Sequence, residues 1–154
     1  VGLMIRDNNP YLVEYNVRMG DPECQTILPL LNSDLLELMQ SCCEGNLDNQ
    51  TIKWKNKKSI CVVLCSDGYP DAYKKNVEIP HLEKIIKNNS TFIYHAGTEL
   101  IDNKVYAIGG RVLNFVNISE DLKKSRESVI NEIKNLGWKN GFYRKDIGFR
   151  IIDK

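Results

Sequence analysis

The 154-residue sequence has almost no net charge, only two histidines and no long apolar segment. Its 21 basic and 20 acidic side chains give a formal charge of +1, so no broad positive field favours nucleic acid or an anionic membrane. The apolar runs are far shorter than the roughly 18 to 20 residues that span a bilayer, and no secretory signal is recognisable. These absences argue against a nucleic-acid or membrane partner and favour a cytoplasmic protein.

The cysteines also lack the spacing of a metal site. There are five, an odd number, and two of them are adjacent. No CxxC pair is matched by a second CxxC or by spaced histidines, which argues against zinc. Four of the five lie in apolar helix or strand patterns, so we expect buried free thiols.

With 42% hydrophobic and 27% charged residues, the composition is that of a globular protein. The order of predicted strands and helices is that of an α+β fold. Residues 60–65 predict a strand buried on both faces, and residues 35–43 predict a core-facing helix. A second helix is predicted before Gly137, and the tail, residues 142–152, is predicted to be extended.

The domain organisation is predicted from a polar stretch at residues 48–58, which we interpret as a linker between residues 1–47 and 59–154. Val1 lies in what reads as the middle of a strand, so we interpret the chain as a piece of a larger polypeptide. We expect residues 1–47 to be poorly ordered or bound to a partner in solution, because an unpaired apolar strand favours association.

A row of polar side chains on one predicted strand is the strongest candidate for a functional site. Alternation along residues 11–18 places Glu14, Asn16 and Arg18 on one face and apolar side chains on the other. The same pattern is typical of an amphipathic strand with a solvated face. A carboxylate and an amide carbonyl two residues apart also suit Mg²⁺, which binds hard oxygen ligands together with nucleotide phosphates.

The strand is followed by Gly20-Asp21-Pro22-Glu23, which predicts a tight turn into a helix. Asp21 is expected at the N-cap and Pro22 at the first helical position. A helix N-terminus beside a polar row suits metal-bound phosphates. Capping and the helix dipole also account for both acidic residues without any functional role.

The stretch Glu14-Tyr-Asn-Val-Arg-Met-Gly-Asp-Pro-Glu-Cys-Gln25 closely resembles the signature of the glycinamide ribonucleotide synthetases (phosphoribosylamine–glycine ligases), ATP-grasp enzymes of purine biosynthesis. Met19 and Cys24 depart from the usual Phe and Thr, and neither carries chemistry. Four later motifs follow in the family's order, so the resemblance covers essentially the whole sequence. They are Val62-Val63-Leu64 with Gly68-Tyr69-Pro70, His95-Ala96-Gly97-Thr98, Gly109-Gly110-Arg111-Val112-Leu113 and Tyr143-Arg144-Lys145-Asp146-Ile147-Gly148.

The resemblance implies the C-terminal end of an ATP-grasp domain followed by a small mixed α/β C-terminal domain. It implies ATP-dependent joining of glycine to 5-phosphoribosylamine, with Mg²⁺ or Mn²⁺ held by Glu14 and Asn16. Glycine's carboxylate would attack the γ-phosphate, so no side chain need act as a nucleophile. Most ATP contacts would lie in the upstream portion of the same enzyme, and we expect the chain alone to be inactive.

Two arginines are candidates for phosphate contacts. Arg18 is either a catalytic residue that steadies a phosphoryl group bidentately or a structural ion-pair partner. Gly109 and Gly110 beside Arg111 form either an anion-binding concavity that contacts ATP or a simple bulge in a strand. Two rival functions stay open at this point: another ATP-grasp carboxylate–amine ligase, and a non-catalytic binding module derived from the ligase.

Overall fold

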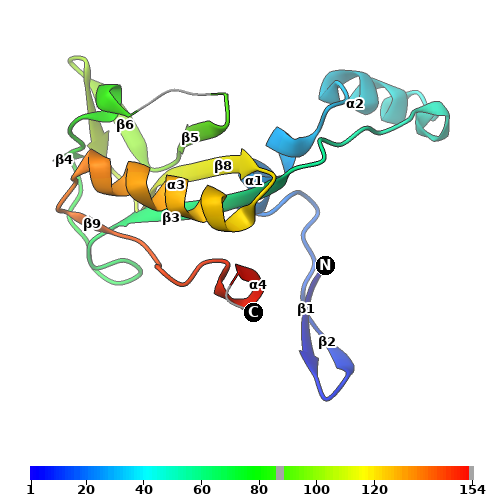
Figure 1. The fold of residues 1–154 in the computed structure, drawn as a ribbon, viewed down its shortest axis with the longest axis horizontal. Helices are drawn as coiled ribbons and strands as arrows, with labels where there is room; N and C mark the ends of the chain where they lie inside the picture. Colours follow the sequence, from blue (N-terminus) through cyan, green and yellow to red (C-terminus); the bar gives the residue numbers. More distant parts are fainter. Residues whose placement is uncertain (86–88, 153–154) are drawn as a thin grey trace.

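The computed structural model describes residues 1–85 and 89–152. A four-stranded antiparallel sheet, in the order β5-β8-β3-β9, lies at its centre (Figure 1). The two central strands pair from Lys58 opposite Ser119 to Leu64 opposite Leu113. The four strands are β3 (Lys58–Ser66), β5 (Thr91–His95), β8 (Arg111–Ser119) and β9 (Gly141–Phe142).

The main core lies between this sheet and α3 (Leu122–Leu136). Val129 and Leu136 are fully buried against side chains of β3 and β8, because their spacing puts them on one face of the helix. The cap is Asp121, whose carboxylate accepts hydrogen bonds from the Lys123 and Lys124 amides at 2.8 and 3.3 Å. Gly137 ends the helix with φ 64°, as predicted. The expectation of an α+β fold is confirmed.

A second, three-stranded sheet has the order β4-β7-β6. Its strands are β4 (Val77–Glu78), β6 (Thr98–Ile101) and β7 (Lys104–Ala107). Of the two alternatives for Gly109 and Gly110, a simple bulge within one strand is wrong. β7 pairs with β4 and β6, whereas β8 pairs with β3 and β5, so the glycines connect two different sheets. Before β5, a short 3-10 helix, η3 (Leu82–Lys84), is described.

The tail is not wholly extended as predicted, since α4 (Phe149–Ile152) follows β9. Ile147 and Ile152 pack against the core and so hold this end of the chain to the domain. No helix among the described residues is long and apolar enough to cross a membrane.

The chain begins with a hairpin of β1 (Gly2–Arg6) and β2 (Asn9–Glu14) that projects from the main body (Figure 1). The predicted strand over residues 11–18 is therefore too long. Glu14 pairs with Gly2 at the start of β1, so residues 15–18 have no facing strand in the described part of the chain. Asn16 and Arg18 consequently lie beyond the strand.

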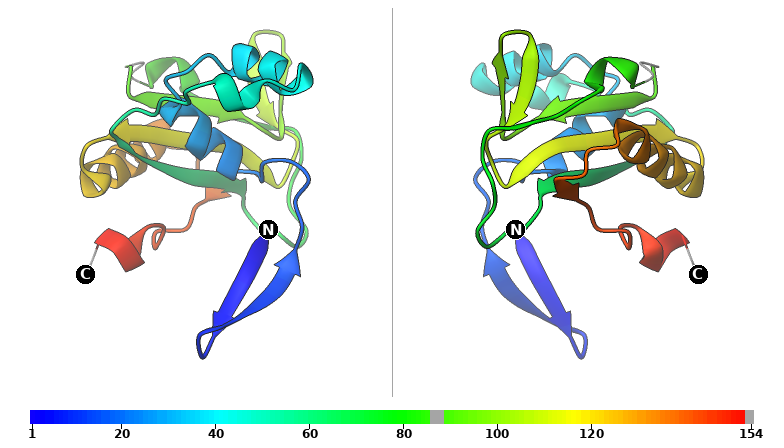
Figure 2. Two further views of the ribbon diagram at one scale, coloured as in Figure 1. Left: turned by 90° about the vertical axis from the view of Figure 1, so that its right-hand side faces the viewer. Right: turned by 90° about the vertical axis from the view of Figure 1, so that its left-hand side faces the viewer.

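Two short helices, α1 (Glu23–Ile27) and η1 (Leu28–Leu30), follow the hairpin region and lie against the central sheet (Figure 2). Pro29 lies in η1, directly after the end of α1, as expected for a residue that cannot continue an α-helix. α1 contacts β3 and β8, and Thr26 hydrogen-bonds Cys61 of β3. Because side chains alternate along β3, Cys61 faces α1 while Ile60 and Val62 face the main core.

The helix α2 (Leu35–Cys43) was predicted to face the core, and this prediction is wrong. Leu36 and Met39 are 73% and 56% exposed, because α2 extends away from the central sheet (Figure 1). All five cysteines are free, but Cys42 and Cys43 are exposed, which corrects the expectation of burial for these two.

The polar stretch that follows, with η2 (Leu47–Asn49), is partly paired. The Lys55 amide donates to the Leu30 carbonyl at 2.8 Å, and the Asn32 amide donates to the Lys53 carbonyl at 2.9 Å. The predicted division into residues 1–47, 48–58 and 59–154 stays a prediction.

The contact between α1 and β3 predicts a difference in thiol reactivity. Burial under α1 raises the pKa of Cys61 to about 11, so that at pH 8 about one Cys61 thiol in a thousand is the reactive thiolate. Cys42 is exposed and should react with iodoacetamide much faster. Mass spectrometry of peptides after a brief pulse at pH 8 measures both rates. Equal rates in the native protein would contradict the packing of α1, and equal rates in urea serve as the control.

Candidate functional site

Glu14 and Asn16 are brought into contact by the turn that follows β2. The Asn16 Nδ2 atom donates a hydrogen bond to Glu14 Oε1 at 3.0 Å. Glu14 is exposed and Asn16 is partly buried. Within the described part of the chain, Glu14 Oε2 and Asn16 Oδ1 have no hydrogen-bond partner. A carboxylate and an amide oxygen side by side fit the ligand preference of Mg²⁺.

No group of three or more His, Cys, Asp or Glu side chains in residues 1–85 and 89–152 could hold a metal. A cation bound by Glu14 and Asn16 would therefore need further oxygen ligands from outside this pair. Phosphates and water are the usual additional ligands of Mg²⁺. The geometry thus fits a metal carried in with a phosphorylated ligand better than a cation held by this chain alone.

Arg18 lies past the strand end and lines a groove of about 460 Å³. Its Nη1 atom donates to the Met19 carbonyl at 2.8 Å, and no carboxylate among the described residues pairs with it. Tyr94 and His95 of β5 line the same groove. The His95 Nδ1 atom is 2.8 Å from Thr98 Oγ1.

The turn at residues 20–23 differs from the predicted one. Pro22 occupies the N-cap position of α1, and no side chain caps the helix there. The Gly20 amide instead donates to Glu23 Oε2 at 3.0 Å. Asp21 is therefore free for two other contacts, and its Oδ1 atom accepts a hydrogen bond from Gln25 Nε2 at 2.8 Å.

The second contact of Asp21 is with Arg111, the first residue of β8. Asp21 Oδ2 lies 3.0 Å from Arg111 Nη2, and Arg111 Nη1 donates to the Asp21 carbonyl at 3.0 Å. The structure thus places Arg111 beside the turn at residues 20–23, which we call the signature turn. Arg111 and Asp21 are 90 residues apart in the chain. Spacing rules could not predict this pair, because no local period links two loops so far apart.

The backbone that carries Arg111 is tightly packed. The Gly97 amide donates to the Arg111 carbonyl at 2.9 Å, and the Gly109 amide donates to the Gly97 carbonyl at 3.1 Å. A Cβ atom on Gly97 would lie 2.6 Å from Gly109 Cα, and one on Gly110 would lie 2.1 Å from the Tyr69 ring. The Gly109 and Gly97 amides are thus used internally, and the segment is a crowded junction between two sheets.

The α1 side of β5 and β3 is desolvated. Burial raises the pKa of Tyr94, and the nearby Cys24 and Cys61 thiols raise it further. Burial also raises the pKa of Cys65, which the positive charge of Arg111 partly offsets. The β-sheet surface beneath α1 is therefore a poor environment for new charge, whereas Glu14 and Arg18 are exposed to solvent.

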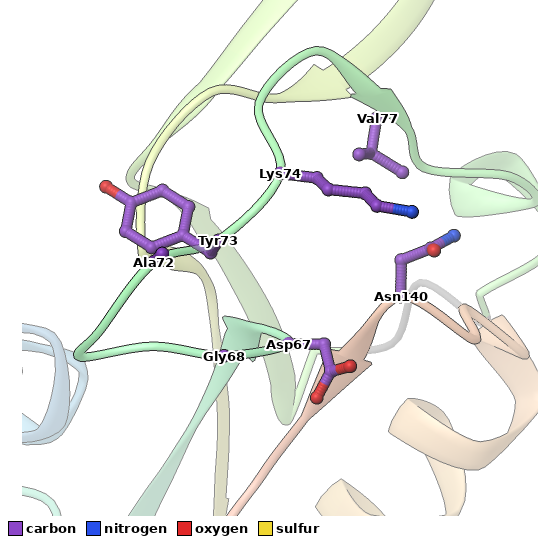
Figure 3. Close-up of a pocket in the computed structure, with 7 residues that line it drawn as sticks. All are labelled: Asp67, Gly68, Ala72, Tyr73, Lys74, Val77 and Asn140. Atoms are coloured by element: carbon purple, nitrogen blue, oxygen red, sulfur yellow. The ribbon is translucent and has the colours of Figure 1, made fainter.

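A separate pocket of about 510 Å³ is lined by the loop that contains Gly68 and by Asn140 (Figure 3). Lys74 and Asn140 point toward one another across it, and Asp67 lies below them. None of the four predicted site residues lines this pocket.

Comparison with known proteins identifies the family. The model of the phosphoribosylglycinamide synthetase C domain matches residues 59–150, and the chain belongs to this family. The phosphoribosylamine–glycine ligase of Caldanaerobacter subterraneus subsp. tengcongensis is 43% identical over 146 residues, which are 95% of this chain and 34% of that protein. The trifunctional purine biosynthetic protein adenosine-3 of Gallus gallus is 43% identical over 152 residues, 98% of this chain and 15% of that protein.

A solved structure agrees with the sequence comparisons. The crystal structure of phosphoribosylamine–glycine ligase from Thermotoga maritima matches with a TM-score of 0.72 at 31% identity. The match covers 96% of this chain and 36% of that one. The chain thus spans about a third of the length of the ligases that it matches.

The crowding at Gly97 predicts a stability difference between two glycine substitutions. Gly97→Ala should lower the free energy of unfolding by about 3 kcal/mol, because the added Cβ meets backbone atoms that cannot move aside. Gly45→Ala is the control: Gly45 has φ +71° and open space around it, so only backbone strain of about 1 kcal/mol is expected. Urea unfolding measures both values. A Gly97→Ala variant as stable as the parent would contradict the described junction.

Proposed function

We propose that this chain supplies a metal-binding edge and the C-terminal domain of an ATP-grasp ligase that joins glycine to 5-phosphoribosylamine. The products would be glycinamide ribonucleotide, ADP and phosphate. The observation that carries the proposal is the contact between Glu14 and Asn16, which leaves one oxygen of each side chain unpaired in the described part of the chain. The family membership and the ligase names of the relatives support the substrate assignment.

The chain's share of the chemistry is charge neutralisation and positioning. When bound, ATP would supply the phosphoryl group that activates the carboxylate of glycine, and Mg²⁺ or Mn²⁺ would offset the charge of its phosphates. Glu14 and Asn16 would hold the metal through their unpaired oxygens. Arg18 has no carboxylate partner in the described residues, so its planar guanidinium is available to orient a phosphoryl group through two parallel hydrogen bonds.

The expected contact between Arg111 and ATP stays a prediction. Both Nη atoms of Arg111 are engaged by Asp21, so a phosphate contact would require the guanidinium to leave Asp21 or to share it. The upstream portion of the enzyme remains the proposed source of the adenine and glycine contacts.

A chimera tests the proposed function directly. The chain replaces the matching segment of the Caldanaerobacter subterraneus ligase, to which it is 43% identical. ADP release is then measured with ATP, Mg²⁺, glycine and freshly formed 5-phosphoribosylamine. We expect turnover that requires both substrates, and none from the 154-residue chain alone. An inactive but folded chimera would favour a non-catalytic module, and turnover with a different amine or amino acid would favour another carboxylate–amine ligase.

The metal role of Glu14 predicts the effect of a nearly isosteric change. Glu14→Gln in the chimera should lower kcat by about a hundredfold or more, because a carboxylate that holds the metal is lost while the shape is kept. Glu99→Gln, which changes an exposed carboxylate on β6, is the matched control and should leave kcat unchanged. Rates are compared at limiting and at saturating Mg²⁺. Parental activity of Glu14→Gln at limiting Mg²⁺ would remove Glu14 from the metal site.

A further inference from the structure

One contact joins the signature turn to the central sheet in two ways at once. Arg111 Nη2 forms an ion pair with the Asp21 carboxylate, and Arg111 Nη1 donates a hydrogen bond to the Asp21 backbone carbonyl, each at 3.0 Å. A lysine could not make both contacts with the same geometry, because its ammonium group is a single point charge without the planar fork. Both side chains are partly exposed, at 44% and 41%.

The sheet side of this contact is rigid. Arg111 begins β8, and the carbonyl of Gly110 before it accepts a hydrogen bond from the Ser66 amide at 2.8 Å. The Arg111 carbonyl itself accepts from Gly97. The guanidinium is therefore presented from a backbone that is fixed on both sides, which is the condition for a precise positioning contact.

The turn side is held by the same contact. Asp21 is oriented by Gln25 from within α1, and the Cys24 amide donates to the Gly20 carbonyl at 2.9 Å. Gly20 and Asp21 line the groove that Arg18 also lines. Fixing Asp21 therefore fixes the backbone that leads to Arg18, three residues away.

We infer that Arg111 and Asp21 are positioning residues: together they clamp the signature turn onto the C-terminal sheet and so set the place of Arg18. The catalytic consequence rests on the proposed function, whereas the clamp itself does not. In this account Arg111 acts through Asp21, and the C-terminal domain contributes to the phosphate site by holding its edge in place.

Hydrogen exchange of the chimera with the Caldanaerobacter subterraneus ligase tests the clamp without any assay of activity. Arg111→Lys and Asp21→Asn should each accelerate exchange in residues 20–28 by about two- to fivefold, the range expected for a partly exposed ion pair. The rate increase in the double variant should be smaller than the product of the two single increases, because both variants weaken the same pairing of Arg111 with Asp21. Protection of α3 should stay unchanged and shows that the variants are folded.

The matched control is Arg144→Lys. Arg144 also forms a close ion pair, with Asp146 at 2.6 Å, but its partner is only two residues away and no second segment is held. Exchange in residues 20–28 should be unaffected. Unchanged exchange there in Arg111→Lys and Asp21→Asn, or rate increases that multiply in the double variant, would overturn the clamp.

Kinetics of the chimera separate positioning from direct contact with ATP. If Arg111 acts through Asp21, both single variants lower kcat/KM, and the loss in the double variant is smaller than the product of the two single losses. If Arg111 binds ATP directly, Arg111→Lys still raises the KM for ATP when Asp21→Asn is already present, and that result would overturn the inference. An inactive parental chimera would count against the proposed function only, since hydrogen exchange decides the clamp independently.

Discussion

The pairing of β3 with β8 is the interaction on which the rest of the structure depends. These two strands occupy the middle of the central sheet, and Leu64 and Phe115 between them are almost fully buried. α3 packs against the main-core side of the pair, and α1 contacts the same two strands through residues such as Thr26. Because β8 begins with Arg111, the sheet that forms the core also delivers the contact that holds the signature turn.

The β1–β2 hairpin, unlike the central sheet, buries few of its apolar side chains within the described part of the chain. Leu3 is paired with Leu12 and Met4 with Tyr11, so apolar side chains lie on both faces, and all four are more than half exposed. Apolar surface on both faces of an isolated two-stranded ribbon is typical of an element that is stable only against other structure. Glu14 ends this hairpin, so the proposed metal site depends on contacts from outside the two-stranded ribbon.

Elements with a clear period or a clear stop signal could be predicted from the sequence. The apolar run at residues 60–65 became β3, and the 3.6-residue spacing before Gly137 became α3. Features set by tertiary pairing could not be predicted. Alternation suggested that Asn16 and Arg18 continue a strand, but strand length is decided by the partner, which ends opposite Glu14. The Arg111–Asp21 contact and the change of sheet at Gly109 depend on segments far apart in the chain, where local patterns carry no information.

The central claim is that the edge formed by Glu14 and Asn16 holds a phosphate-bound cation. The most direct measurement is the anomalous scattering of Mn²⁺ in crystals of the chimera grown with ATP. The account predicts one manganese peak bonded to oxygens of both Glu14 and Asn16 and to oxygens of the nucleotide phosphates, at about 2.0 to 2.2 Å. Manganese bound with ATP at another site, with both side chains left unligated, would contradict it.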